Sequence, residues 1–281
     1  MFSFLNGKIL PEAEAVVPLN DRGFLLGDGL FETVRVAGGK PFRFAQHLER
    51  LSRGADFLKI KLPFAPVEIQ KFAAQLIAKN NLPEAILRLT LTRGAGARGY
   101  STKNCGAPTL ALTLHLLQSQ NSAVPGSWSL VTSSFRMPAG DALAAFKTTS
   151  KILNVLARAE AEAQGADEAL LLNTSGEVVE TAGGNIFWIE RKAVCTVPTE
   201  RGVLPGITRA VVLEICQSLG IATNQCVIQS AHLKNATGIF ITQSALGIIP
   251  VTTFDGQSVT PSPLVAQVAD AYHEILRREA I

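Results

Sequence analysis

Residues that could hold and activate an amine-reactive cofactor lie in the second half of the chain. Lys147, in "AAFKTTSKILN", stands where an irregular stretch meets a predicted long helix, and Glu180 ends the run "EVVET" before two glycines. Ile207 and Thr208 open the predicted helix "ITRAVVLEI", and Ser244 follows the strand-like run "FITQ". The sequence therefore offers an amine nucleophile, a carboxylate and hydrogen-bond donors at a helix start.

Pyridoxal phosphate requires this set of groups. Its aldehyde forms a Schiff base with a lysine, and a carboxylate beside the pyridine nitrogen keeps that nitrogen protonated, so that the ring accepts electrons. The amides at the start of a helix bind phosphate well, and Ser244 and Arg50 can add a hydroxyl and a charge-assisted bond. Taken singly, a lysine at a helix start is usually a solvated charge, and a Pro-Gly turn followed by Thr208 is usually only a cap.

A glycine-rich loop, "LTRGAGARGYST" at residues 91–102, carries G-x-G-x-x-G spacing. A dinucleotide site would need a helix directly after the glycines and an acidic residue about 20 positions on. The next run is strand-like instead, and no Asp or Glu occurs between Glu84 and Asp141. We therefore expect this loop to join two strands and to present Arg98 and Tyr100.

Hydrophobic periodicity predicts a two-domain α/β protein of the α+β type. The first half alternates predicted strands (2–7, 30–44, 85–93, 109–117) with helices (47–60, 65–81). The second half mixes strands (127–135, 167–173, 177–181, 185–190, 238–243) with helices (150–165, 207–220, 263–280). We expect a small N-terminal α/β domain over 1–117, a polar linker over 118–127, and a larger mixed-sheet domain over 128–281 that carries Lys147.

Composition excludes several classes of function. With 281 residues, 47% hydrophobic and 17% charged, the chain is typical of a globular protein, and a net charge of +3 does not indicate nucleic-acid or membrane binding. No signal segment or membrane span is visible, so we expect a cytoplasmic location. Four cysteines without C-x-x-C spacing and four scattered histidines predict neither a metal site nor a disulfide framework.

Six motifs, in this order and spacing, resemble the class IV aminotransferases, the fold-type IV pyridoxal-phosphate enzymes: "DRGFLLGDGLFETVRV", "HLERL", "FKTTSKILNVLARAEAEAQGADEALLLN", "GEVVETAGGNIFW", "LPGITR" and "SALGIIPV". The resemblance covers nearly the whole chain. It implies that Lys147 is the Schiff-base lysine, although spacing alone leaves Lys151 open, and that Glu180 contacts the pyridine nitrogen. It also implies a homodimer, and a phosphate site formed by Arg50, Ile207, Thr208 and Ser244.

The glycine-rich loop bears on the subgroup. "RGAGARGYS" looks most like the loop of 4-amino-4-deoxychorismate lyases, in which Arg98 would bind a substrate carboxylate. Tyr100 and Phe31 stand where D-amino acid aminotransferases carry histidine and tyrosine. The resemblance thus implies a lyase of the folate pathway that forms 4-aminobenzoate and pyruvate. The alternatives are an aminotransferase acting on D-amino acids, branched-chain amino acids or (R)-amines, and, from another class, a non-catalytic binding module.

Overall fold

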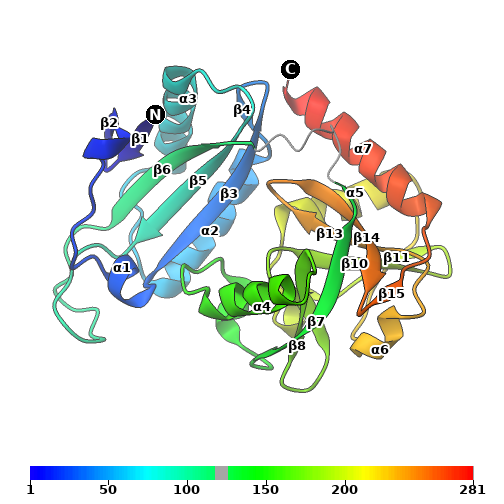
Figure 1. Ribbon diagram of the computed structural model, residues 1–281. Helices are drawn as coiled ribbons and strands as arrows, with labels where there is room; N and C mark the ends of the chain where they lie inside the picture. Colours follow the sequence, from blue (N-terminus) through cyan, green and yellow to red (C-terminus); the bar gives the residue numbers. More distant parts are fainter. Residues whose placement is uncertain (118–125, 281) are drawn as a thin grey trace. The chain divides into compact units, whose positions relative to one another are not determined.

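The chain divides into two compact units. The computed structural model describes residues 1–117 and 126–280 (Figure 1). Unit 1 comprises Met1–Gln118, Phe146–Lys151 and Leu276–Ile281, and unit 2 comprises Ser119–Ala145 and Ile152–Ile275. Most of the predicted linker, residues 118–125, lies outside the described residues.

Unit 1 contains a six-stranded antiparallel sheet. Its strand order is β2-β1-β6-β5-β3-β4. Strands β5 and β6 pair along their whole length, so the glycine-rich loop does join two neighbouring strands. The bounds are β1 (Phe2–Leu5), β2 (Lys8–Pro11), β3 (Gly29–Ala37), β4 (Lys40–Pro41), β5 (Ala85–Thr92) and β6 (Thr109–Leu116).

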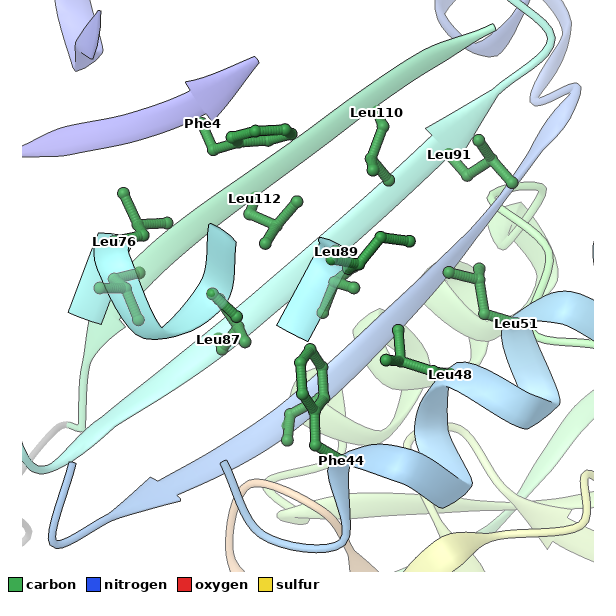
Figure 2. Packing of buried hydrophobic residues seen from close by; sticks show 14 of the residues in the cluster. Phe4, Phe44, Leu48, Leu51, Leu76, Leu87, Leu89, Leu91, Leu110 and Leu112 are labelled. Atoms are coloured by element: carbon green, nitrogen blue, oxygen red, sulfur yellow. The ribbon is translucent and has the colours of Figure 1, made fainter. Parts of the chain in front are cut away.

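Two amphipathic helices cover one face of this sheet. They are α2 (Phe44–Leu58) and α3 (Pro66–Asn80), and a short helix α1 (Arg22–Leu26) precedes β3. Alternate residues of the strands meet the buried sides of both helices, as Figure 2 shows for Leu89 of β5 and Leu48 of α2. Each fully buried leucine of this kind contributes roughly 1.5–3 kcal/mol. The apolar core therefore fixes which strand residues face the helices and which face away.

The segment around Lys147 belongs to unit 1, whereas the sequence analysis placed it in the C-terminal domain. Backbone hydrogen bonds explain the difference. Phe31 N–H donates to the Lys147 carbonyl at 2.9 Å, and Thr149 N–H donates to the Gly29 carbonyl at 2.9 Å. Thr148 forms a β-bridge with Leu30. The chain thus returns to β3 more than a hundred residues after leaving it, a contact that no local pattern encodes.

Unit 2 contains a mixed sheet with helices packed against it. The strand order is β12-β11-β10-β13-β14-β7-β8-β9, and β15 pairs with β14. The strands are β7 (Trp128–Met137), β8 (Glu168–Asn173), β9 (Val178–Thr181), β10 (Asn185–Glu190), β11 (Ala193–Thr196), β12 (Thr223–Gln225), β13 (Ile239–Gln243), β14 (Gly247–Phe254) and β15 (Gln257–Ser258). The helices are α4 (Ile152–Ala163), α5 (Ile207–Ser218), α6 (Ser230–Leu233) and α7 (Pro263–Ala280), of which the part from Leu276 onward belongs to unit 1. Short 3-10 helices are η1 (Glu12–Glu14) in unit 1 and η2 (Ala142–Ala145) and η3 (Thr199–Arg201) in unit 2.

The predicted elements are all present, with ends displaced by a few residues. Helix α7 has the predicted bounds, and α2 begins three residues earlier than predicted because β4 ends at Pro41. Several elements have no predicted counterpart, because they are short or, in β14, contain Pro250: β2, β11, β12, β14, β15, α1 and α6. Within the described ranges, no helix is both long and apolar enough to cross a membrane.

Candidate active site

Lys147 lies at the edge of β3 in unit 1. Its carbonyl is held by Phe31 N–H, so the strand fixes the backbone that carries the lysine. Its side chain is half-buried, and Nζ lies 4.6 Å from the centre of the Phe31 ring. The amine is therefore placed against an aromatic face next to the sheet.

Arg88 of β5 approaches the same aromatic ring. Its guanidinium carbon lies 4.1 Å from the centre of the Phe31 ring, because Arg88 pairs with Thr33 on β3 and so shares a face with Phe31. Burial lowers the pKa of Arg88 from its ordinary value. Its guanidinium has no hydrogen-bond or ion-pair partner among the described residues and lies over the Phe31 ring. An anion that binds beside Phe31 would thus meet Arg88, and no carboxylate of residues 1–117 or 126–280 pairs with this arginine.

The sequence analysis missed Arg88. The available signal was a charged side chain in "AILRLTLT", a strand whose other positions are apolar or threonine. On a strand, a residue of that kind is usually solvated, so the sequence alone did not distinguish it from a surface charge.

A fully buried ion cluster occupies the other face of the same sheet. Glu32 Oε1 accepts from Arg50 Nε at 2.9 Å, and its Oε2 accepts from Arg50 Nη2 at 2.6 Å and lies 2.7 Å from His47 Nδ1. Burial raises the pKa of Glu32, but the hydrogen bonds from Arg50 and His47 outweigh it and lower the pKa to about 2. Burial lowers the pKa of His47, against the opposing effect of Glu32. Arg50, the predicted phosphate ligand, is thereby held rigidly on α2.

Glu180 is tied to the segment that leads into α5 of unit 2. It ends β9, is buried, and its Oε2 accepts from Leu204 N–H at 3.1 Å. The Asn185 side chain donates to the Leu204 carbonyl at 2.9 Å, and a Cβ on Gly206 would lie 2.0 Å from Asn185 Oδ1. The glycine of "LPGITR" is therefore needed for close packing against β10, and Asn185 is a positioning residue that the sequence analysis did not identify.

The first amides of α5 suit an anion. Gly206 at the N-cap provides no side-chain cap, and the N–H groups of Ile207 and Thr208 have no acceptor within the helix. Asn185 of β10 pairs with Thr242 of β13, two residues before Ser244. The carboxylate, the helix start and the serine thus belong to adjoining elements of unit 2.

Two of the predicted substrate residues project from the glycine-rich loop. Arg98 and Tyr100 are exposed, Tyr100 to 88%. Their predicted contacts with a substrate stay predictions. In the part of the chain that is described, no group of three or more His, Cys, Asp or Glu side chains could hold a metal ion.

Comparison with known proteins identifies the family. The family model "Amino-transferase class IV" matches residues 29–254. A Methanocaldococcus jannaschii protein named "Putative branched-chain-amino-acid aminotransferase" is 34% identical over 91% of this chain and 88% of its own length. A Bacillus licheniformis D-alanine aminotransferase is 28% identical over 98% of this chain and 96% of its own.

Solved structures agree on the fold. A branched-chain aminotransferase from Thermoproteus uzoniensis with norvaline superposes with a TM-score of 0.92 at 28% identity, over 99% of this chain and 96% of that one. A "Putative 4-amino-4-deoxychorismate lyase" from Legionella pneumophila gives a TM-score of 0.86 at 28% identity, over 94% and 97%. The predicted α/β fold class is confirmed, as is the prediction of an enzyme. The chain belongs to the class IV aminotransferase family, whose members are pyridoxal-phosphate enzymes.

Proposed function

We propose that this chain is a pyridoxal-phosphate-dependent aminotransferase that transfers the amino group of a carboxylate-bearing amino acid to a keto acid. The observation that carries the proposal is the pair of groups at Phe31. The Lys147 amine and the Arg88 guanidinium both approach that ring, at 4.6 and 4.1 Å. A nucleophilic amine and a cation without an acidic partner in the described ranges fit a substrate with an amino group and a carboxylate.

The residues present fit the cofactor in their chemistry. Pyridoxal phosphate, when bound, supplies an electron sink for the negative charge that develops at the substrate Cα. Lys147 offers the amine that holds it and afterwards moves the Cα proton. Glu180 offers the carboxylate that keeps a proton on the pyridine nitrogen. The donors for the phosphate are Arg50, the amides of Ile207 and Thr208, and the Ser244 hydroxyl.

Arg88 is the residue that we assign to the substrate carboxylate. A guanidinium presents a planar pair of donors that matches a carboxylate, and burial strengthens such a contact because water competes less. The middle of an antiparallel sheet, with Thr33 on one side and Thr113 on the other, holds it in place. An arginine fixed there selects amino acids over simple amines.

A lyase is the second candidate, and the sequence analysis favoured it on the glycine-rich loop and Phe31. The relatives support an aminotransferase better, since those reported above bear aminotransferase names, and one structure at a TM-score of 0.86 carries a lyase name. The loop features that favoured the lyase, Arg98 and Tyr100, are exposed side chains. Arg98 and Tyr100 therefore bear on which substrate is preferred. The role proposed for Lys147 is the same in an aminotransferase and in a lyase.

A side-by-side assay of the holoenzyme separates these functions. We would offer L-leucine, D-alanine, (R)-1-phenylethylamine and 4-amino-4-deoxychorismate, each with 2-oxoglutarate or pyruvate as acceptor. The proposal predicts keto acid formation from at least one amino acid, and an amine reaction at least about a hundredfold slower, since it lacks the carboxylate. Release of 4-aminobenzoate from the chorismate derivative, without amino transfer from either amino acid, would make the chain a lyase.

We also propose a homodimer. Around α1, large apolar side chains are exposed, among them Leu19 to 81% and Phe24 to 73%. Large apolar side chains exposed to this degree within one short segment are typical of a protein interface. Light scattering should give twice the chain mass, and Phe24→Asp should shift it toward the monomer. A monomeric wild type with full activity would contradict the proposal.

A further inference from the structure

Arg22 of α1 reaches across to the glycine-rich loop. Only 4% of it is exposed. Its Nη1 donates to the Gly99 carbonyl at 2.9 Å and to the Ser101 carbonyl at 3.2 Å, and Nη2 lies 3.5 Å from the Tyr100 carbonyl. One guanidinium therefore holds three consecutive carbonyls of a loop segment whose side chains are exposed.

The guanidinium is itself anchored. Arg22 Nε donates to Asp28 Oδ2 at 2.8 Å, and Arg93 binds both oxygens of the same carboxylate, at 2.8 and 3.0 Å. Arg93 also donates to the carbonyls of Leu58 and Lys59 at the end of α2, at 2.9 and 3.1 Å. Asp28 thus connects Arg22 to the packed body of unit 1, so Arg22 cannot turn with the loop.

Gly96 makes room for this arrangement. A Cβ at Gly96 would lie 2.7 Å from Arg22 Cδ, closer than carbon atoms can approach without movement. Gly106 in the same loop differs, because a Cβ there would meet the Ala95 carbonyl oxygen at an ordinary 3.4 Å. The glycine spacing that failed as a nucleotide motif therefore has a local explanation at one position: close approach of Arg22.

We infer that Arg22 is a positioning residue that fixes the backbone of Gly99–Ser101 and thereby the direction in which Arg98 and Tyr100 leave the loop. The effect of Arg22 on substrate binding rests on the proposed function, whereas its effect on the loop conformation does not. Without Arg22 the carbonyls turn to water, and the loop tip samples many conformations.

Trypsin cleavage after Arg98 tests the effect on the loop, because a protease requires the residues around the bond to leave their native conformation. In Arg22→Met, which keeps an unbranched apolar stem and removes the donors, we expect cleavage at least about tenfold faster than in wild type. Gly96→Ala should have the same effect, since it displaces Arg22 and retains its charge. Gly106→Ala is the matched control and should cleave at the wild-type rate.

Unchanged cleavage in Gly96→Ala and in a folded Arg22→Met would overturn the inference. If Arg22→Met fails to fold, Gly96→Ala and Gly106→Ala still decide it. These outcomes need no enzymatic activity.

A double-mutant cycle tests the consequence for substrate. Arg22→Met should raise KM for the amino acid and lower kcat/KM about tenfold with kcat less affected, but should lower kcat/KM less than about twofold when Arg98 is already alanine. Additive effects would show that Arg22 does not act through Arg98. A wild type that transfers no amino group would refute the proposed function and leave the proteolysis result standing.

Discussion

The two faces of the sheet in unit 1 differ in how their charged side chains are paired. On the helix-covered face, Glu32, His47 and Arg50 are buried together and satisfy one another. On the opposite face, Arg88 lies over Phe31 with no acidic partner in the described parts of the chain. Glu32 and Phe31 are neighbours in sequence, and only the alternation of a strand separates the two environments.

The two faces therefore contribute to different properties of the protein. A buried carboxylate between an arginine and a histidine stabilises the fold as long as all three are present, and it fixes Arg50 in place. On the other face, Arg88 has no acidic partner among the described residues and can accept a ligand, and the Lys147 amine lies against the same ring. Substituting Glu32 or His47 on the first face should therefore cost stability, and substituting Lys147 or Arg88 on the second face should cost activity.

The largest expected effect is on turnover. Lys147→Ala removes the amine on the reactive face and should lower kcat by a factor on the order of 10⁶, the loss typical of removing a catalytic nucleophile. The free energy of unfolding should change little, because the half-buried side chain contributes few core contacts. Lys151→Ala is the control and should retain turnover; the reverse pattern would move the chemistry to Lys151.

Stability should respond on the other face. Glu32→Gln removes the carboxylate that pairs with the buried Arg50 and His47, and it should lower the free energy of unfolding by about 3–5 kcal/mol. Arg88→Met fills the same volume without a charge that must be desolvated, and should change it by less than about 1 kcal/mol. Urea unfolding of both variants checks the contrast. Equal losses would mean that the two faces do not differ as described.

The pH dependence of stability should isolate Glu32. Its pKa is lowered from 4.5 to about 2, so its contribution is present above pH 4.5 and is lost as the pH falls toward 2. The shift corresponds to a contribution on the order of 3 kcal/mol. The pKa of His47 is lowered from 6.5, so protonation of His47 also reduces stability as the pH falls below 6.5. The difference in unfolding free energy between wild type and Glu32→Gln should therefore become smaller as the pH falls. The exposed Glu49→Gln is the control and should not show this change. A difference between wild type and Glu32→Gln that stays constant with pH would contradict the prediction.

The smallest expected effect is on substrate selection. Arg88→Met should lower kcat/KM for an amino acid about ten- to a hundredfold, corresponding to a charge-assisted hydrogen bond of roughly 1.5–3 kcal/mol, while cofactor affinity is retained. Arg88→Lys should recover only part of the loss, because an ammonium lacks the planar pair of donors. If kcat/KM for (R)-1-phenylethylamine falls as much as for the amino acid, Arg88 does not bind the carboxylate.

Local patterns predicted much of the fold. The apolar spacing of residues 263–280 and the proline at their start gave the bounds of α7, and alternation gave β5 and β6. Those signals are local, because the spacing of apolar residues within one segment shows which face of the helix or strand is buried. The return of residues 146–151 to β3 was not predicted, because backbone hydrogen bonds between distant segments leave no periodicity in either.

The candidate site was predictable in part. Lys147 and Glu180 were predicted from residue type, position and family resemblance, and their roles stay predictions. Arg88 and Asn185 were missed, because their roles depend on what lies beside them in space: an aromatic ring for one and the Leu204 carbonyl for the other. Arg50 was singled out for a phosphate, and its strong pairing with Glu32 emerged only from the structure.

Borohydride reduction of the holoenzyme followed by peptide mapping tests the central claim most directly, namely that the chemistry occurs at the amine beside Phe31 and Arg88. Reduction converts a lysine-bound cofactor into a stable pyridoxyl adduct that mass spectrometry can locate. We predict the adduct on Lys147, with trypsin no longer cleaving after that residue. An adduct on Lys151, or a fully active enzyme that carries no adduct, would contradict the account.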